Sequence, residues 1–378
     1  TLTIIEAGGS PDPRFNVSRS TNDSPRGSVA LKYDLGGDAR ANLNLSAVKT
    51  IFRSEESKDR TDLQRPSFSE RLNSRNDVFG YEISGDIEFP FGPGRLKLIG
   101  LGSADSGEFV TQSRVASEGR ADTGSRFVRG TDEGEQIARG EYSWQLWGAD
   151  WELSLEGAFN QLENSAELFR LDADGAYVPF FFPGGSGGVR EDRYEAGLSF
   201  GRPLAANLAL QVTVAAEHST IVQSGANALG RGLKRPKGSL SLAWAPAEEL
   251  DLSLRVARRV GQLSFSDFLA SVNLTDNNSS AGNNRLRPQQ TWEVELEGSR
   301  DFGAWGSATL KLFHHMIEDY ITIIPILTGG EARGNIATAV STGVDLNATV
   351  RLEPVGVQGA KIDVRGQIER SRLPDPVT

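Results

Sequence analysis

The fold is decided by residues 292 to 312, which read WEVELEGSRDFGAWGSATLKL. From Trp292 to Gly298 every second residue is apolar or glycine, and the residues between them are glutamates. Asp301 to Ala304 provide a tight turn, after which the alternation resumes and runs to Leu312. Successive side chains of a strand point to opposite faces of its sheet. This stretch therefore predicts a β-hairpin with one apolar face and one face of charged and polar side chains.

The same alternation recurs from one end of the chain to the other. We predict about seven hairpins, and hence about fourteen strands of roughly ten residues, a length that crosses the hydrocarbon of a membrane. Short turns alternate with longer polar stretches that we expect to be loops: residues 53–77, 98–133 and a stretch that ends at Asp192. The turns fall near residues 38, 92, 149, 205, 248, 303 and 356. This arrangement is typical of an all-β, antiparallel up-and-down transmembrane β-barrel in the cell outer membrane.

Composition supports a membrane barrel over other membrane and nucleic-acid-binding classes. Hydrophobic residues make up 38% of the 378 residues, and no apolar run approaches the ~18 residues of a membrane helix. The net charge of −10 argues against nucleic acid as a partner. The chain has no cysteine, so thiolate metal sites and disulfides are excluded.

The alternative fold is a soluble β-sandwich or β-propeller. A propeller blade contains four short strands, whereas each period of this sequence contains two long ones. A soluble protein would also need a very large core to bury so many apolar strand faces. The membrane barrel is therefore the favoured interpretation, and aromatic residues beside the turns, such as Trp151 and Trp305, fit the interfacial girdles of such barrels.

Several short motifs extend this interpretation to a family. Asn284–Pro288 precede the strand with Glu295 and Gly298, and residues 319–321, 334–336 and 343–345 follow at family-like spacing. The region from Leu263 to Leu352 thereby resembles the barrel domain of the TonB-dependent outer-membrane receptors. The family usually has an acidic residue after the proline and a glutamate after Gly-Val, where this chain has Gln289 and Asp345.

The resemblance implies a barrel of about 22 strands that is closed by an N-terminal plug domain. This chain has fewer strands, no recognisable plug and no terminal aromatic residue, so we expect a fragment. Residues 1–27 are predicted to be a linker or the end of an upstream plug domain, and residues 28–378 a partial outer-membrane β-barrel.

The function implied by the resemblance is active uptake of a large, scarce nutrient such as a ferric siderophore, cobalamin or an oligosaccharide. The implied partners are outer-membrane lipid and lipopolysaccharide, the nutrient, and an inner-membrane TonB complex that acts through the plug. No cofactor is expected. The alternatives are a passive porin-type channel, which needs no plug, and a soluble β-rich binding protein.

Residues with catalytic or metal-binding potential have a simpler interpretation. Glu293, Glu295 and Glu297 occupy consecutive polar-face positions, which favours lining of the barrel lumen over acid–base catalysis. His314 and His315 are adjacent, so on a strand they face opposite ways and cannot chelate one metal. The glycine-rich stretch 183–188 lacks the Lys-Ser/Thr ending of a phosphate loop. We therefore expect neither an enzyme nor a metal site.

An aromatic group on a predicted outer loop is the candidate ligand-binding site. We expect these side chains either to contact a ligand at the entrance or to pack against neighbouring loops. The group comprises Tyr177, Phe180, Phe181 and Phe182.

A basic cluster is predicted on another outer loop. It offers charge-assisted contacts to lipopolysaccharide phosphates, and the alternative is an ordinary solvated loop. The cluster comprises Arg231, Lys234, Arg235 and Lys237.

Overall fold

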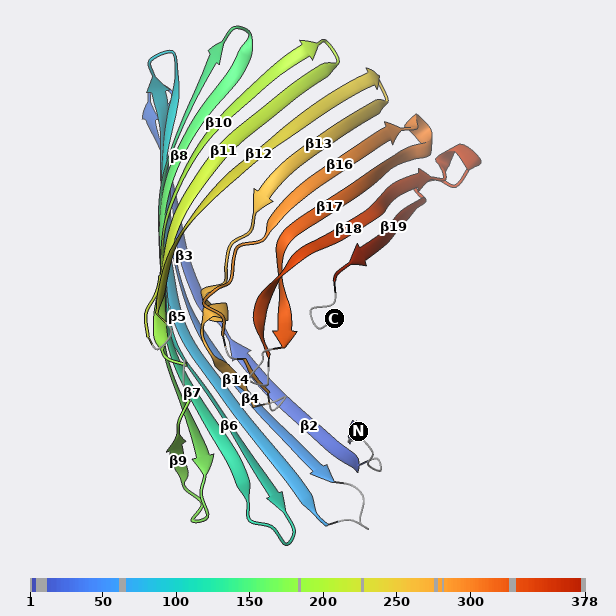
Figure 1. Cartoon of the computed structure of the whole chain (residues 1–378). Coiled ribbons are helices and arrows are strands. Elements are labelled where there is room, and N and C mark those ends of the chain that lie inside the picture. The colour runs from blue at the N-terminus through green and yellow to red at the C-terminus, as the bar shows by residue number, and fades with distance from the viewer. Residues whose placement is uncertain are drawn as a thin grey trace.

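A computed structural model of the chain describes residues 2–4, 12–60, 66–182, 185–225, 228–274, 278–280, 282–325 and 331–374. Within these ranges the chain forms nineteen strands in one sheet (Figure 1). The strands are β1 (Leu2–Ile4), β2 (Asp12–Asp23), β3 (Arg26–Gly36), β4 (Ala39–Arg60), β5 (Phe68–Phe91), β6 (Gly94–Ser117), β7 (Thr123–Leu146), β8 (Ala149–Leu171), β9 (Tyr177–Phe180), β10 (Gly187–Ala205), β11 (Leu208–Gln223), β12 (Leu229–Ala247), β13 (Leu250–Val260), β14 (Ser271–Asn273), β15 (Asn278–Ser280), β16 (Gln290–Asp301), β17 (Gly306–Pro325), β18 (Glu331–Arg351) and β19 (Lys361–Arg372). Three short 3₁₀ turns are η1 (Phe265–Phe268), η2 (Gly303–Trp305) and η3 (Glu353–Val355). Among the described residues, no helix has the length and apolar character needed to cross a membrane.

The long strands follow one another as an antiparallel meander. Each strand from β4 to β8 pairs with the next, β8 pairs with β10, the order continues to β13, and β16 to β19 complete it. Figure 1 shows that this sheet curves strongly and encloses a concave side. The described strands form an open wall, because no described pairing joins β19 to β3. The predicted fold class is confirmed.

The tight turns of the predicted hairpins all lie at one end of the wall, at the top of Figure 1. Several use left-handed backbone, which glycine adopts without strain. Gly306 shows why one position requires glycine: its φ is +114°, and a Cβ atom there would collide with the carbonyl oxygen of Thr349 on β18. In barrels of this architecture such short turns face the periplasm.

The predicted assignment of the two sheet faces is confirmed. On the outer, convex face, Leu254 and Leu296 are opposite each other and expose 36% and 46% of their surface. The neighbouring glutamates face the concave side, which we call the lumen face. There the Glu295 carboxylate lies 2.7 Å from the Lys311 ammonium group, and the Glu293 carboxylate lies 3.0 Å from the Arg259 guanidinium. No second layer covers the apolar face in the described part of the chain.

The strands are longer than the sequence predicts, so the predicted loops are wrong. Residues 53–60 and 68–77 are strand, and Arg53 pairs with Arg75 across β4 and β5. Residues 98–117 and 123–133 likewise belong to β6 and β7, and β5 to β7 each have 24 residues. Beyond the hydrocarbon a strand no longer needs an apolar outer face, whereas its backbone groups still pair. The hydropathy pattern therefore ends before the hydrogen-bond ladder does.

Part of the predicted N-terminal linker is also strand. Residues 12–23 form β2, which pairs with the far half of β4, while β3 pairs with the near half. Pro25 separates β2 from β3 because it has no N–H group to donate to the ladder. Its carbonyl oxygen still accepts a hydrogen bond of 3.1 Å from the Lys49 amide. One strand with a proline interruption therefore runs along β4.

The basic cluster predicted on an outer loop lies within β12 instead, and strand alternation divides it. Arg231, Arg235 and Lys237 face the lumen, whereas Lys234 faces outward with Leu240 and Leu242. The glycine-rich stretch predicted as a loop enters β10 at Gly187, and its residues 183 and 184 lie outside the described residues.

A new charge should cost more stability on the lipid-facing side of the sheet than on the lumen face, and this difference gives a first prediction. Leu254→Arg places a cation against lipid near the middle of the apolar band, and we expect it to lower the free energy of unfolding by ~2–4 kcal/mol. The adjacent Ser253 faces the lumen opposite Glu297, so Ser253→Arg should change that free energy by less than about 1 kcal/mol. Urea unfolding of the full-length protein in lipid vesicles measures both values. Equal losses for the two variants would mean that the faces are exchanged.

Candidate functional site

Between β13 and β16 the chain leaves the wall and enters the concave side. We call the described residues of this stretch (261–274, 278–280 and 282–289) the inner segment. Figure 1 shows its strand β14 inside the curve of the sheet. Leu286 of the inner segment is fully buried, and with Phe268 it packs against Val189 of β10 and Ile221 of β11. These two wall residues occupy lumen-face positions, which elsewhere along the same strands hold polar or small side chains. The inner segment is therefore held to the wall by a small apolar core inside the bore.

Polar wall residues also hold the inner segment through its backbone. Gln223 Nε2 donates to the Phe268 carbonyl oxygen at 3.3 Å. Arg231 donates to the Leu286 carbonyl oxygen, and its guanidinium lies 5.7 Å from the centre of the Phe268 ring. Gly282 approaches the Phe268–Leu269 backbone so closely, at φ +69°, that a side chain there would clash. The path of the inner segment is thus fixed at several points.

A single asparagine side chain joins three of the family-like motifs. The Arg287 amide donates to Asn335 Oδ1 at 2.8 Å, and Asn335 Nδ2 donates to the carbonyl oxygens of Arg287 and Asp319 at 2.7 and 2.6 Å. The Arg287 guanidinium also lies 2.6 Å from the Asp319 carboxylate. Asp319 adopts left-handed backbone with φ 54°. Motifs that are far apart in the sequence therefore meet where the inner segment rejoins the wall.

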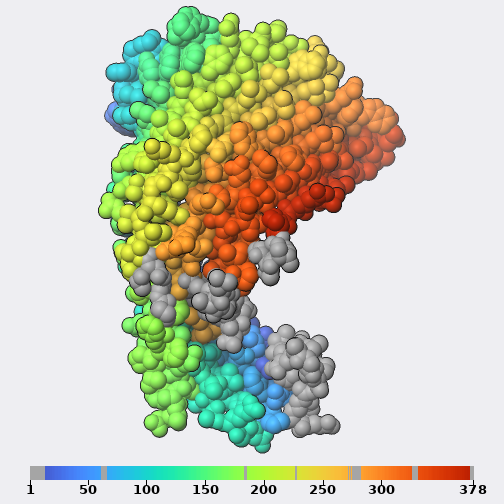
Figure 2. All heavy atoms as spheres, in the orientation of Figure 1, coloured from blue at the N-terminus to red at the C-terminus, as the bar shows by residue number. Residues whose placement is uncertain are grey.

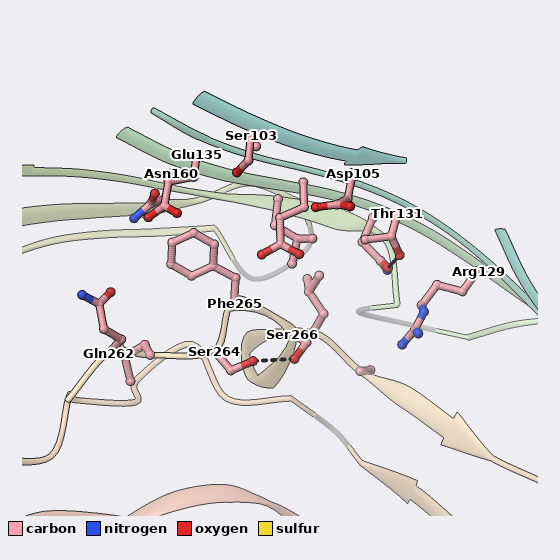
Figure 3. A pocket seen from close by; sticks show the side chains of 17 residues that line it. Ser103, Asp105, Arg129, Thr131, Glu135, Asn160, Gln262, Ser264, Phe265 and Ser266 are labelled. Carbon is pink, nitrogen blue, oxygen red and sulfur yellow. Dashed lines mark hydrogen bonds between the residues drawn. The ribbon is translucent and has the colours of Figure 1, made fainter. Parts of the chain in front are cut away.

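A pocket of about 570 Å³ lies between the inner segment and the lumen face of β6 to β8 (Figure 3). Its wall side is polar, and its inner-segment side contributes Phe265 and two serine hydroxyls. The Oγ atoms of Ser264 and Ser266 are 2.7 Å apart. The lining residues are Ser103, Asp105, Arg129, Thr131, Glu133, Gly134, Glu135, Asn160, Leu162, Asn164, Gln262, Leu263, Ser264, Phe265, Ser266, Leu269 and Ala270.

The pocket offers several hydrogen-bonding groups to a ligand. Its lining contains three carboxylates, from Asp105, Glu133 and Glu135, and one guanidinium, from Arg129. The buried Oδ1 atom of Asn160 accepts no hydrogen bond from the described residues. An unpaired buried oxygen of this kind costs free energy until a donor satisfies it. The arrangement therefore suits a polar ligand that presents hydrogen-bond donors.

Asp267 lies in η1 near the rim of this pocket. Burial raises the pKa of its carboxyl group above the usual value, and the positive charge of Arg333 opposes that shift. The Arg333 guanidinium is 3.8 Å away, so burial has the larger effect. Among the described residues, no group of three or more potential ligands is placed to hold a metal ion.

The lumen face beside the inner segment carries a ladder of ion pairs across β8, β10, β11 and β12. Arg235 is directly opposite Glu217, and the two charged groups lie 2.9 Å apart. The Lys237 ammonium group lies 2.7 Å from the Glu195 carboxylate, and Arg193 lies 3.1 Å from Glu156. Two of the four residues of the predicted basic cluster, Arg235 and Lys237, are therefore neutralised inside the bore.

The four aromatic residues predicted to bind ligand do not converge. The Tyr177 hydroxyl donates to the Ser113 carbonyl oxygen at 2.9 Å, and burial raises its pKa. The Phe180 ring lies under the Arg170 guanidinium at 3.5 Å, and Phe182 meets the buried Phe127 ring edge-on at 5.8 Å. Phe181 is 84% exposed. Tyr177 and Phe182 thus pack against the wall, whereas Phe180 stays 41% exposed beside Arg170 and Phe181 is the most exposed of the four.

The sequence pattern did not predict the inner segment, although the sequence contains one indication of it. Apolar residues at lumen-face positions, such as Val189, Ile221 and Leu233, interrupt the polar side of their strands. An apolar side chain at such a position predicts that another segment of protein packs against the wall inside the bore. The identity of that packed segment depends on pairing between β13 and β16, which periodicity does not reveal.

Comparison with known proteins gives one family. The family described as "TonB dependent receptor-like, beta-barrel" matches residues 6–372. No curated protein matches the chain.

Solved structures with the same fold include three transporters of different cargo. The copper transporter OprC is 10% identical with a TM-score of 0.52, the ferric yersiniabactin uptake receptor FyuA from Yersinia pestis is 12% identical with 0.50, and the RagAB peptide importer is 10% identical with 0.52. They cover 94%, 95% and 92% of this chain. The chain spans 62%, 61% and 50% of theirs. At these identities the likeness concerns the fold alone.

The asparagine contacts at the end of the inner segment generate a second prediction. Asn335→Ala removes the acceptor of the Arg287 amide and the donor to two carbonyl groups, so we expect a local loss of ~1–3 kcal/mol. Hydrogen–deuterium exchange of residues 283–288 should accelerate by roughly tenfold or more. Asn347→Ala is the matched control, because Asn347 lies on the lumen face of the same strand and the described residues show no side-chain hydrogen bond for it. Unchanged exchange in the Asn335 variant would contradict the proposed role.

Proposed function

The chain belongs to the TonB-dependent receptor β-barrel family. We propose that it forms part of the wall of a transporter that imports a nutrient with energy from the TonB complex. Proteins of this family lie in the outer membrane, and the apolar outer face of the sheet fits that location. The predicted location and the family are thereby confirmed. Family members are transporters rather than enzymes, which agrees with the sequence-based expectation of no catalytic activity.

One observation carries the proposal: the inner segment occupies the bore and forms a polar pocket with the wall. A passive channel needs a continuous aqueous path, whereas a receptor needs a site that retains its ligand before energy is applied. The pocket supplies carboxylate, amide and hydroxyl groups on the route through the barrel. This supports capture of a ligand over free diffusion.

The cargo we propose is a polar nutrient too large for porins: a ferric siderophore, cobalamin or an oligosaccharide. Each of these carries several hydroxyl or amide groups that can donate to the pocket carboxylates. The energy would reach the bore through a plug domain engaged by the inner-membrane TonB complex. Paired charges line the bore, and such a surface suits contact with a polar plug domain that moves inside it.

Uptake by cells that express the full-length protein tests this function. We expect one labelled compound from a panel of ferric siderophores, cobalamin and oligosaccharides to accumulate only when the TonB complex is present and the inner membrane is energised. Asp105→Asn combined with Glu135→Gln should weaken binding of that compound by about tenfold to a hundredfold, because hydrogen bonds to charged groups contribute ~1.5–3 kcal/mol.

The control variant is Glu152→Gln, which changes a lumen-face carboxylate outside the pocket. It should leave the affinity unchanged. Accumulation that continues without the TonB complex would instead identify a passive channel and overturn the proposal.

The outer aromatic group generates a separate prediction. If Phe181 contacts the ligand at the entrance, Phe181→Ser should lower the affinity for the ligand by several-fold and leave thermal stability unchanged, since its ring is exposed. Phe182→Ser should instead lower stability, because it removes the ring that packs on Phe127. Equilibrium binding and thermal unfolding of both variants separate the two roles. A Phe181 variant with wild-type affinity would remove the aromatic group from the binding site.

A further inference from the structure

A groove of about 800 Å³ lies on the outer face of the wall, across β8, β10, β11 and β12. Strand register builds it from two neighbouring rows of outward side chains. One row comprises Gly157, Tyr194, His218 and Lys234, which are opposite one another on the four strands. The next row towards the short turns comprises Leu155, Ala196, Ala216 and Pro236. We call this surface the outer groove.

The outer groove is hollow because small residues lie between large ones. Gly157, Ala196 and Ala216 provide its floor, and the Tyr194 ring lies beside Gly157. Phe159 meets Tyr194 edge-on at 6.0 Å and closes one side. Most of the outer face instead carries leucine, valine and isoleucine, which would fill such a space. The result is an elongated apolar depression rather than a smooth barrel surface.

The rim of the outer groove away from the short turns carries positive charge. His218 and Lys234 are exposed and directly opposite each other. Neither takes part in an ion pair within the described ranges. The nearby Asp192 carboxylate is 3.3 Å from the Arg190 guanidinium and is thereby compensated. Arg258, which donates to the Pro236 carbonyl oxygen at 2.6 Å on the side towards the short turns, is likewise compensated by the Glu318 carboxylate at 4.0 Å.

Along the strands, this rim lies at the level expected for the membrane–water interface on the side away from the periplasmic turns. His218 lies about ten residues beyond the turn that precedes β11, and a tilted strand of ~9–11 residues crosses the hydrocarbon. Between the turn and the groove the outward residues Leu210, Val212 and Val214 are apolar. Tyr194 and His218 are therefore expected at the level of the lipid headgroups, on the side away from the periplasmic turns.

We propose that the outer groove binds a phosphate-bearing lipid of the outer leaflet. One acyl chain lies over Leu155, Ala196 and Ala216, and the phosphate lies against Lys234 and His218. Ammonium and imidazole N–H groups form charge-assisted hydrogen bonds to phosphate oxygens, which are stronger than neutral ones. The inference uses the membrane location of the wall and is independent of which nutrient crosses the bore.

Charge complementarity and shape together favour a lipid over the other possible occupants. A protein partner would need a larger surface than this single depression. An ordinary annular lipid needs neither a hollow nor an unpaired ammonium group beside an imidazole. The structure also reduces the basic cluster predicted from sequence to one residue, Lys234, because Arg231, Arg235 and Lys237 face the lumen. His218 on the neighbouring strand takes their place.

Native mass spectrometry of the full-length protein in detergent tests the proposal. The probes are a bis-phosphorylated, multiply acylated lipid A and its dephosphorylated form. We expect lipid A to bind the wild type at least tenfold more tightly than the dephosphorylated form does. Lys234→Gln combined with His218→Gln should reduce lipid A affinity to that of the dephosphorylated form.

Two further variants separate charge from shape. Arg202→Gln combined with Arg300→Gln removes two outward-facing cations near the short turns and should leave lipid A affinity unchanged. Ala216→Phe fills the hollow and should weaken both lipids, while a membrane-facing aromatic side chain leaves folding intact. Equal affinity for the two lipids, or wild-type affinity in the Lys234 and His218 double variant, would overturn the proposal. A protein retained at this face and released by Ala216→Phe would also overturn it.

Discussion

Every backbone N–H and C=O group of a membrane-spanning strand must find its partner on a neighbouring strand, because the hydrocarbon offers none. This constraint explains the long ladders from β4 to β8 and from β10 to β13, in which the register shifts only beside the short turns, at residues 203–205 and 244–247. It also explains the response to Pro25, which interrupts one strand without removing it from the sheet. Once pairing is obligatory, side chains have only two directions, and the division between lipid and bore follows.

The lumen face of the wall both pairs its charged residues and holds the inner segment. Its polar face carries paired charges such as Arg235 with Glu217, but it also carries Val189 and Ile221, which hold the inner segment. Asn335 then fixes the return of that segment by replacing backbone partners for Arg287 and Asp319. A polar pocket results from these contacts, because the segment is held at a distance from β6 to β8. The contacts that hold the inner segment thus also shape the pocket.

The outer face of the wall also combines two kinds of surface. Apolar side chains form the lipid-facing band, yet small residues at Gly157, Ala196 and Ala216 leave a depression beside His218 and Lys234. A barrel in a lipid bilayer contacts molecules on both faces at once. Alternation along β12 assigns neighbouring basic residues to these two environments: Lys234 to the membrane side, and Arg235 to an ion pair in the bore.

The sequence by itself determined the hairpins, their turns and the lipid and lumen faces, because a period of two and a turn signal are local properties of the chain. The family was indicated separately, by the resemblance of short motifs such as residues 284–288 and 343–345. Local patterns could not show that residues 53–60 and 68–77 continue as strand, since pairing and not hydropathy maintains a strand beyond the membrane. The inner segment, its pocket and the asparagine contacts were decided only by tertiary structure. They depend on residues such as Phe268, Ile221 and Asn335, which are far apart in the sequence and meet only when the sheet curves around them.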